Sequence, residues 1–223
     1  MRVQSERDGG VSNGQWAMGV YATVSEFPIM SLDRAGSSQR GGKVRIIGGM
    51  WRRRMLNLPR VAQVRPTPDR VRETLFNWLA PFIAGTSCLD AFAGSGALGF
   101  EAASRGASRV RLLDTSAEVV AHLREQCEAF DAQTISVEHA DAVSWLERPA
   151  VESFDAIFID PPFDAELIEP TVNAIAGNGW LASGGVVFIE AGARAARPEL
   201  PVGWAFEREK RAGRVRYYLA SRV

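Results

Sequence analysis

The sequence of 223 residues is poor in the side chains that build disulfides and metal sites, since it holds two cysteines and two histidines. Cys88 lies in an apolar, strand-like run and Cys127 in a helix-like one, which gives neither a disulfide framework nor zinc spacing. His122 and His139 are not at metal-ligand spacing either. A reducing, cytoplasmic setting and a protein without a metal are therefore expected.

Long apolar runs are also missing, and none reaches the roughly 18 residues that a membrane span needs. The N-terminus lacks a basic stretch followed by an apolar core, so no secretory signal is expected. With 46% hydrophobic residues, the chain can bury one sizeable core and carry an appendage.

The chain has no net charge, because 26 basic residues balance 26 acidic ones. The distribution is uneven, however. Residues 43–72 hold nine Lys or Arg against Asp69 alone, whereas residues 73–223 hold 13 basic and 21 acidic residues. A basic segment joined to an acidic body is typical of a polyanion-binding attachment, and the alternative is an ordinary solvated basic face.

Three segments follow from composition and pattern. Residues 1–42 contain repeated Gly and Ser without periodicity, which predicts a flexible N-terminal extension. Residues 43–66 predict a basic β-hairpin, with strands at 44–47 and 52–58 around a Gly-Gly turn. Residues 67–223 predict the main domain, which begins with a helix capped by Thr67 with Pro68 as its first residue.

Strand and helix patterns alternate through this main domain. The predicted strands are 87–91, 109–114, 135–138, 154–160 and 185–190, and the predicted helices are 97–104, 117–130, 142–147 and 165–176. A final pair of strands, 204–210 and 215–220, reads as a hairpin. Alternating elements predict an α/β, Rossmann-like fold with parallel βαβ units, and the hairpin adds an antiparallel edge that makes the sheet mixed.

A glycine-rich loop follows the first of these strands and opens a helix. Gly94 to Gly99 spells G-x-G-x-x-G, and Asp114 stands 20 residues after Gly94 at the end of the next strand, where a carboxylate can bind ribose hydroxyls. Both a nicotinamide dinucleotide and S-adenosylmethionine would use these features. A nicotinamide-dependent oxidoreductase is therefore one hypothesis.

The start of the loop favours S-adenosylmethionine. Asp90 and Phe92 precede the glycines, and an acid there suits an α-amino group and a sulfonium, whereas it would repel a pyrophosphate. Gly96 continues the loop, and Asp141, after the third strand, can accept a hydrogen bond from the adenine amino group. S-adenosylhomocysteine would be the product.

The strongest chemical signal is the sequence Asp160-Pro161-Pro162-Phe163, which ends an apolar strand at the same edge of the sheet. Two prolines force the chain out of the sheet. The Asp160 carboxylate and the Pro161 carbonyl can accept both N–H bonds of a base amino group and stabilise the charge that develops on its nitrogen. Phe163 offers a stacking face for a base that has been turned out of its stack. A strand-ending turn with a capping Asp is the alternative.

These motifs together resemble the bacterial RsmD-type family of small-subunit ribosomal RNA guanine-N2 methyltransferases. The resemblance covers about residues 43–222 and is carried by residues 45–49, 65–67, 70–79, 90–99, 160–163, 178–182 and 208–210. It implies a class I S-adenosylmethionine-dependent methyltransferase fold with a mixed seven-stranded sheet, helices on both faces and an N-terminal β-hairpin that grips RNA. The extension 1–42 is a departure from the family, and at Asp141 the family also admits Asn.

The same resemblance implies the substrate and the site. Gly94, Gly96 and Asp114 would bind the donor with Asp141 at its adenine, and Asp160 and Phe163 would handle the guanine. The target would be guanine 966 of 16S ribosomal RNA. Naked RNA and an assembled or partly assembled 30S particle both remain open as the substrate; a shape-reading hairpin favours the particle, and a monomeric enzyme is expected. The RNA-binding candidates are Arg45, Arg52, Arg53, Arg54, Arg65 and Arg70.

Other hypotheses remain open at this point. A DNA adenine-N6 methyltransferase uses a similar Asp-Pro-Pro-aromatic turn, although it normally carries a larger recognition region. A non-catalytic RNA-binding module would keep the basic hairpin and would not need Asp160. Trp51, beside the arginines, either stacks on a nucleotide or packs in the protein.

Overall fold

The computed structural model describes residues 42–60, 67–162 and 166–223, all of which belong to one compact unit. Residues 1–41 of the proposed extension lie outside the described residues, and so do Arg65 and Phe163. Among the described helices, none has the length and apolar character that a bilayer crossing requires.

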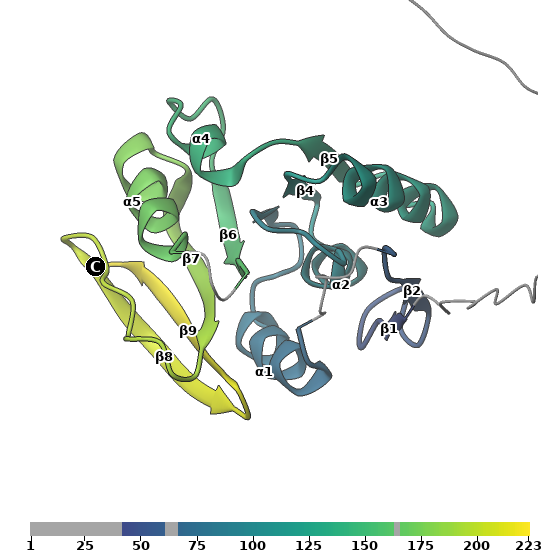
Figure 1. Cartoon of the computed structure of the whole chain (residues 1–223), viewed down its shortest axis with the longest axis horizontal. Coiled ribbons are helices and arrows are strands. Elements are labelled where there is room, and N and C mark those ends of the chain that lie inside the picture. Colours follow the sequence, from purple (N-terminus) through teal and green to yellow (C-terminus); the bar gives the residue numbers. More distant parts are fainter. Residues whose placement is uncertain (1–41, 61–66, 163–165) are drawn as a thin grey trace, which may run out of the picture. The chain divides into compact units, whose positions relative to one another are not determined.

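A mixed seven-stranded sheet forms the centre of the protein (Figure 1), as predicted. Its spatial order is β5-β4-β3-β6-β7-β9-β8, and the first five are parallel while β9 runs antiparallel between β7 and β8. The strands are β3 (Ser87–Asp90), β4 (Arg109–Asp114), β5 (Ile135–His139), β6 (Phe154–Ile159), β7 (Leu181–Gly192), β8 (Trp204–Ala212) and β9 (Val215–Arg222).

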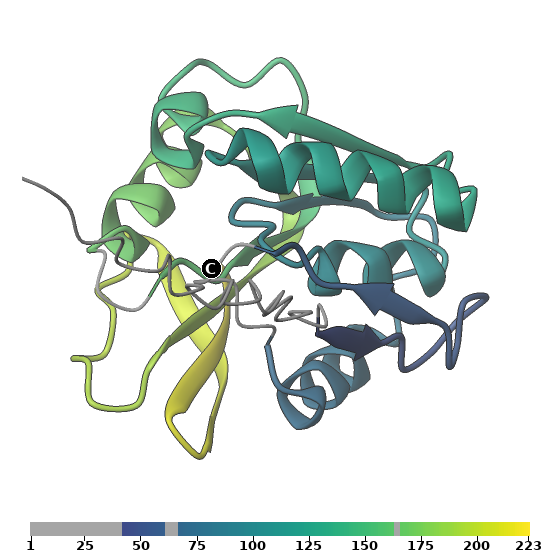
Figure 2. The same cartoon turned by 45° about the vertical axis from the view of Figure 1, so that its right-hand side comes forward.

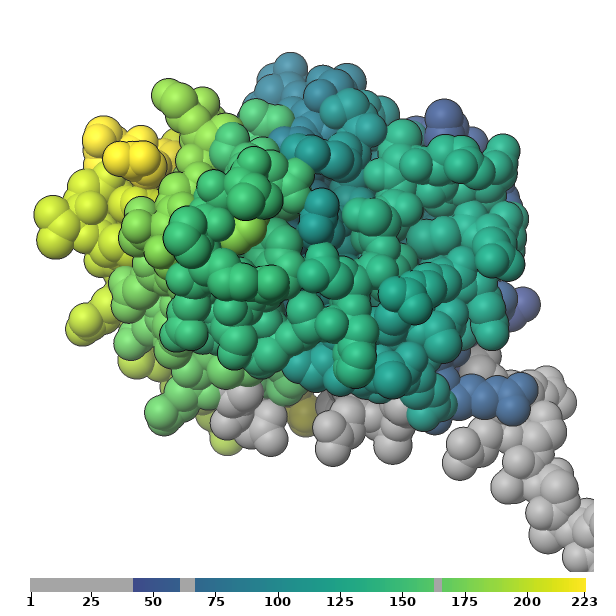
Figure 3. Space-filling model, turned by 90° about the horizontal axis from the view of Figure 1, so that it is seen from above, coloured from purple at the N-terminus to yellow at the C-terminus, as the bar shows by residue number. Residues whose placement is uncertain are grey.

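Helices cover both faces of this sheet, because its central strands bury side chains on both sides. Phe158 and Phe188 belong to one apolar cluster, with α1, α2 and α3, whereas Ile159 and Ile189 belong to the other, with α4 and α5. The helices are α1 (Asp69–Leu79), α2 (Ala97–Ser104), α3 (Ala117–Phe130), α4 (Ala142–Leu146) and α5 (Ile168–Asn178). In the space-filling view of Figure 3, teal to green residues of the middle of the chain cover most of the visible face.

The predicted N-terminal hairpin is present, but its strands are short. β1 (Lys43–Arg45) pairs antiparallel with β2 (Met55–Asn57), and the predicted ranges were longer at the loop. The physical reason is that the backbone N–H groups of Ile47 and Gly48 donate to Glu101 of α2 at 2.8 Å instead of continuing the ladder. Figures 1 and 2 show the hairpin beside α2, while the C-terminal hairpin of β8 and β9 lies on the other side of α1.

The predicted cap of the first helix is wrong. Helix α1 begins at Asp69 after Pro68, and Thr67 makes no cap hydrogen bond. The Thr67 hydroxyl donates instead to Oδ2 of Asp160, at 2.8 Å, across 93 residues of sequence. The start of α1 is therefore tied to the end of β6.

Candidate active site

Acidic side chains collect at the carboxyl edge of the sheet, where the parallel strands end. Asp90 ends β3, Asp114 ends β4, and Asp160 follows directly after β6. Glu190 lies near the end of β7 and was not singled out from the sequence, where it looks like the close of an apolar run. Ligands of open α/β sheets bind outside this edge, so the fold brings the predicted loop and the predicted reaction centre together.

The glycine-rich loop has the conformation that only glycine adopts easily. Gly94 has φ of 47° and Gly96, which precedes α2, has φ of 76°. A Cβ on Gly96 would lie 2.7 Å from Leu123, and one on Gly99 would lie 2.2 Å from Leu112. These glycines allow the loop and the first turn of α2 to pack closely against the sheet.

Two carboxylates hold the loop in place. Asp90 accepts from the Gly99 N–H at 3.1 Å, and Asp114 accepts from the Gly94 N–H at 2.9 Å and from the Ser116 N–H at 2.8 Å. The predicted pair of Asp90 and Asp114 therefore lies on either side of the glycines. Asp141 is exposed and caps α4 by accepting from the Ser144 N–H at 2.9 Å.

Asp90 is deeply buried, and one of its two carboxyl oxygens accepts from Gly99. It is 1% exposed, and burial, reinforced by the charge of Asp160, raises its pKa to about 7. Its Oδ1 has no hydrogen-bond partner among the described residues. A buried acceptor without a partner fits a ligand that carries a cationic donor, such as the α-amino group of S-adenosylmethionine. Phe92, half-buried beside it, packs against the apolar cluster of α4 and α5.

Asp160 is fixed at the point where the chain leaves the sheet. The Thr67 hydroxyl orients its carboxylate, and Pro161 behind it is buried. Burial raises the pKa of Asp160 to about 6, against the opposing effect of the Thr67 hydrogen bond. The carboxylate is thus mostly ionised at neutral pH and available as an acceptor. Pro162 is exposed.

Glu190 lies on the strand beside Asp160. A cavity of about 520 Å³ has Glu190, Pro161 and Pro162 in its wall, together with Glu166, Ile168, Glu169, Ala191, Gly192, Ala195, Ala196 and Pro198. Glu190 is 2% exposed, and burial together with the charge of Asp160 raises its pKa to about 9. A carboxylate and a protonated carboxylic acid therefore lie side by side at this edge.

The predicted RNA-binding arginines divide into two groups. Arg70 is exposed in the first turn of α1, and Arg45 pairs with Asp69 at 3.4 Å with just over half of its side chain exposed. Both lie near Thr67 and hence near the carboxyl edge. Arg72, one of the nine basic residues of segment 43–72, is fully buried.

Arg52, Arg53 and Arg54 lie in the loop between β1 and β2, and that loop contacts the C-terminal half of α2. The Met50 N–H donates to the Ser104 carbonyl at 2.7 Å. The last turn of this eight-residue helix is about 10 Å along its axis from the glycine-rich loop. The Arg54 guanidinium donates to the Ala129 carbonyl at 2.8 Å and lies 3.9 Å from the centre of the Phe130 ring.

Trp51 packs inside the protein, which decides between its two readings. It is 7% exposed, and its ring lies 6.0 Å from Phe100 and 5.4 Å from Phe130. Its backbone N–H donates to the Ser104 hydroxyl at 2.9 Å. The arginine loop is thus anchored on the body of the protein by a buried aromatic side chain.

The turn between β8 and β9 is a second basic segment, which no sequence motif marks. Val215 pairs with Gly192 and Arg216 with Ala191, so this turn lies at the carboxyl edge, just beyond Glu190. Arg211 and Arg214 are exposed there. Residues 73–223 as a whole hold more acidic than basic residues, so a count over the whole segment does not reveal this local excess of positive charge.

The chain matches a family model and named relatives over nearly all of the residues that the structure describes. The family model "Conserved hypothetical protein 95" matches residues 44–221. Ribosomal RNA small subunit methyltransferase D of Escherichia coli is 44% identical over 181 residues, covering 81% of this chain and 91% of that protein. The chain belongs to the RsmD-type family of ribosomal RNA methyltransferases.

A second relative and two solved structures are similar to the chain over about the same length. Ribosomal RNA small subunit methyltransferase D of Haemophilus influenzae is 38% identical to the chain, and the match covers 80% of this chain and 93% of that protein. Among solved structures, yhhF from Escherichia coli has a TM-score of 0.76 at 42% identity, covering 81% of this chain and 98% of that one. HI0767 from Haemophilus influenzae has a TM-score of 0.70 at 37% identity, covering 80% and 98%. The fold is the Rossmann-like class I methyltransferase fold that the motifs predict.

Proposed function

We propose that this RsmD-type protein methylates the exocyclic N2 amino group of a guanine in small-subunit ribosomal RNA, with S-adenosylmethionine as the methyl donor. The observation that carries the proposal is Asp160, an ionisable carboxylate held by Thr67 at the sheet edge that also carries the Asp90 glycine loop. Family membership supports ribosomal RNA as the substrate. A ribosomal substrate implies a cytoplasmic enzyme.

The donor would be held by the loop and the acids around it. The unpartnered Oδ1 of Asp90 suits the α-amino group, Gly94 and Gly96 let the backbone approach the ligand, and Asp114 suits the ribose hydroxyls. Phe92 and Asp141 would flank the adenine. When bound, S-adenosylmethionine supplies a sulfonium methyl group that is already reactive, and the chain need only align its acceptor.

Asp160 and the Pro161 carbonyl would then hold the two N–H bonds of the base amino group. That amino group is a poor nucleophile because the ring delocalises its lone pair, and two acceptors direct the nitrogen toward the methyl carbon. During methyl transfer, the ionised Asp160 would stabilise the positive charge that develops on the nitrogen and would accept the proton that the nitrogen loses. Phe163, which lies outside the described residues, would stack on the base.

RNA would reach this site across positive surfaces. The hairpin 43–66 would act as the RNA-binding segment of the methyltransferase domain 67–223, through Arg45, Arg52, Arg53, Arg54, Arg65 and Arg70. The exposed Arg211 and Arg214 of the C-terminal hairpin would contact phosphates at the opposite end of the edge. Because these groups are spread over separate elements, a folded particle suits them better than a short single strand.

The substrate can be tested directly. The purified protein is incubated with donor labelled in its methyl group and with small-subunit particles, naked 16S ribosomal RNA or adenine-containing duplex DNA. We expect label in the ribosomal RNA, on the N2 of one guanine when the nucleotide is mapped, at position 966. Label in DNA alone would overturn the proposal. Calorimetry that finds binding of NAD and none of S-adenosylmethionine or S-adenosylhomocysteine would overturn the choice of donor.

A further inference from the structure

Glu190 and Asp160 occupy equivalent positions on neighbouring strands. Ile159 of β6 pairs in parallel with Ile189 of β7, so the next residue of each strand lies beside the other. Both isoleucines belong to the cluster of α4 and α5, and side chains alternate along a strand. Asp160 and Glu190 therefore both project to the opposite face, where Thr67 meets Asp160.

The described residues leave the buried Glu190 carboxyl group with an oxygen that has no hydrogen-bond partner. Its side chain is 2% exposed, and its Oε2 has no hydrogen-bond partner among the described residues. Buried carboxyl oxygens in native proteins are nearly always hydrogen-bonded, and one that is not requires a reason. Leu, Met or Gln would fill the same space without burying an acid.

A ligand held at Asp160 would supply that partner, because the two acids are neighbours across the β6–β7 pair and the charge of Asp160 acts on Glu190. The cavity of about 520 Å³ borders Glu190, Pro161 and Pro162 at the same edge, and Ile168 and Glu169 of α5 form part of its wall. A base whose amino group is held at Asp160 would present its adjoining ring atoms to the neighbouring strand. Burial keeps the pKa of Glu190 at about 9, so at neutral pH this acid offers one hydroxyl donor and one carbonyl acceptor.

We propose that Glu190 determines the specificity for guanine by pairing with the N1–H and O6 of the target base while Asp160 holds the N2 amino group. This inference rests on the proposed function and extends it. The carbonyl oxygen of Glu190 accepts from N1–H, and its hydroxyl donates to O6.

The other bases that carry an amino group do not match this order of acceptor and donor. With the adenine N6 at Asp160, the adjoining atoms are the N1 acceptor and a C–H, which leaves one partner of Glu190 unused. With the cytosine N4 at Asp160, both adjoining polar atoms, N3 and O2, are acceptors, and one of them faces the carbonyl oxygen. A buried polar group left unpaired in this way makes a site reject the wrong ligand strongly.

A double-mutant cycle between protein and base tests the pairing. Small-subunit particles are assembled with 16S RNA that carries either guanine or 2-aminopurine at the methylated nucleotide; 2-aminopurine keeps the N2 amino group but lacks N1–H and O6. The wild-type protein, Glu190→Gln and Glu190→Leu are compared by kcat/KM on both particles. Circular dichroism, thermal melting and calorimetric S-adenosylhomocysteine binding check each variant.

On guanine we expect Glu190→Leu to lose about 100-fold in kcat/KM, while Glu190→Gln, whose amide also offers one donor and one acceptor, stays within about tenfold of wild type. On 2-aminopurine the wild type should drop by a similar factor, and Glu190→Leu should add little further loss. Non-additivity of this kind identifies two groups that interact directly.

Two other results would overturn the inference. The first is that the loss caused by Glu190→Leu and the loss caused by 2-aminopurine multiply, as they do for two groups that do not interact. The second is equal loss in the Gln and Leu variants, which would indicate that a charge or the fold is what Glu190 provides. If Glu190→Leu fails to fold, the wild type and Glu190→Gln on the two particles still decide, because Gln must show the same preference for guanine as wild type. A wild-type protein that methylates no guanine particle would overturn the proposed function itself.

Discussion

Buried acids in two regions of this protein are treated in opposite ways. In the hairpin interface, where residues 47–51 contact α2, Glu101 is fully buried and accepts from the backbone of Ile47 and Gly48 and from the Arg105 guanidinium. At the carboxyl edge, Glu190 is just as buried, yet one of its oxygens has no partner among the described residues. The first acid completes the fold, and the second keeps an oxygen for the ligand that we propose it binds.

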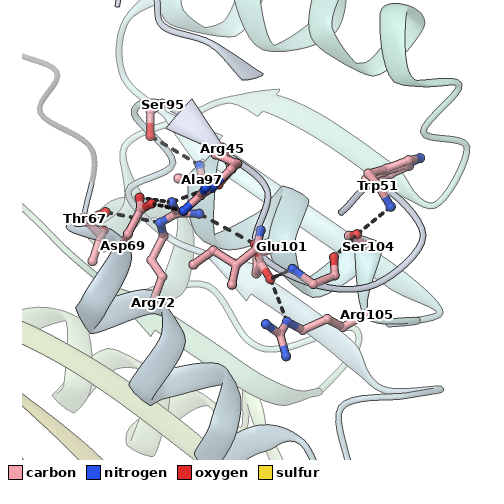
Figure 4. A network of polar contacts seen from close by, with 12 residues as sticks. Arg45, Trp51, Thr67, Asp69, Arg72, Ser95, Ala97, Glu101, Ser104 and Arg105 are labelled. Atoms are coloured by element: carbon pink, nitrogen blue, oxygen red, sulfur yellow. Dashed lines mark hydrogen bonds and ion pairs between the residues drawn. The ribbon is translucent and has the colours of Figure 1, made fainter. Parts of the chain in front are cut away.

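Arginines also differ between the two regions. Figure 4 shows Arg72 between Asp69 and Glu101, and its guanidinium donates to Asp69 at 2.6 Å and to the Arg45 carbonyl at 3.0 Å. Arg72 therefore serves the protein itself. Arg211 and Arg214, at the carboxyl edge, are exposed. The two acids thus differ in their hydrogen-bond partners at similar burial, whereas the arginines differ in burial.

The strongest test of the carboxyl edge is Asp160→Ala. Because this change removes the acceptor that aligns the amino group and receives its proton, we expect kcat for methyl transfer to fall about 1,000-fold. Donor binding and the melting temperature should change little, since removal of a charge that repels Asp90 and Glu190 offsets the lost Thr67 hydrogen bond. Methyl transfer is measured with labelled donor, and Asp160→Asn serves as the matched variant that keeps the shape. An active Asp160→Ala protein would contradict the assignment.

The hairpin interface should show the reverse behaviour in Glu101→Gln. This variant leaves the buried Arg72 without its full counter-charge, and we expect a loss of about 3 kcal/mol in the free energy of unfolding. The activity per folded molecule should be unchanged. Glu128→Gln, on the exposed face of α3, is the matched control and should cost less than about 0.5 kcal/mol. Both are measured by urea unfolding, and equal effects would remove the distinction between the regions.

The pH dependence of stability sharpens the comparison. The pKa of Glu190 is raised from 4.5 to about 9, so between these pH values the folded protein binds a proton that the unfolded chain does not. The proton on Glu190 therefore contributes fully to the free energy of unfolding below pH 4.5. As the pH rises from 4.5 toward 9, the free energy of unfolding falls by up to about 1.4 kcal/mol per pH unit. Glu190→Gln should flatten this decline in urea unfolding series from pH 5 to pH 9. Identical slopes would mean that Glu190 does not hold the proton.

The smallest effect is expected for the exposed arginines. Arg211→Gln with Arg214→Gln should weaken binding of the RNA substrate about tenfold near 0.1 M salt and reduce the salt dependence of binding by about two phosphate contacts. Arg52→Gln with Arg53→Gln should weaken it less, because the loop that carries them contacts the end of α2 that is farther from the glycine-rich loop. Filter binding at several salt concentrations measures both pairs. A larger loss for Arg52 and Arg53 would assign the main contact to the hairpin loop.

Local patterns were enough to predict the order of strands and helices and the site motifs. The glycine loop, Asp90, Asp114 and Asp160 each follow a recognisable strand, and parallel strands necessarily bring their ends to one edge. Arg72 and Glu190 were missed because nothing local distinguishes a buried charge from a surface one. Their surroundings come from segments far away in the sequence.

Contacts between distant segments also explain the errors in detail. Thr67 has the sequence context of a helix cap, but a hydrogen bond to Asp160, 93 residues away, takes its hydroxyl. The strands of the hairpin were predicted too long because Glu101, more than 50 residues away, takes the N–H groups of Ile47 and Gly48. Propensity predicts what a segment can do alone, and a distant partner decides what it does.

Gly49 has a consequence for genetics. Its φ is 74°, and a Cβ placed there would lie 1.7 Å from the Ser104 carbonyl oxygen, so any side chain would push the hairpin off α2. An allele with a substitution at this position would score as a loss of methylation in cells, with a defect that worsens at higher temperature. The Gly49 allele would thus be grouped with Asp160 alleles in a genetic screen, and melting of the purified proteins would separate the two classes.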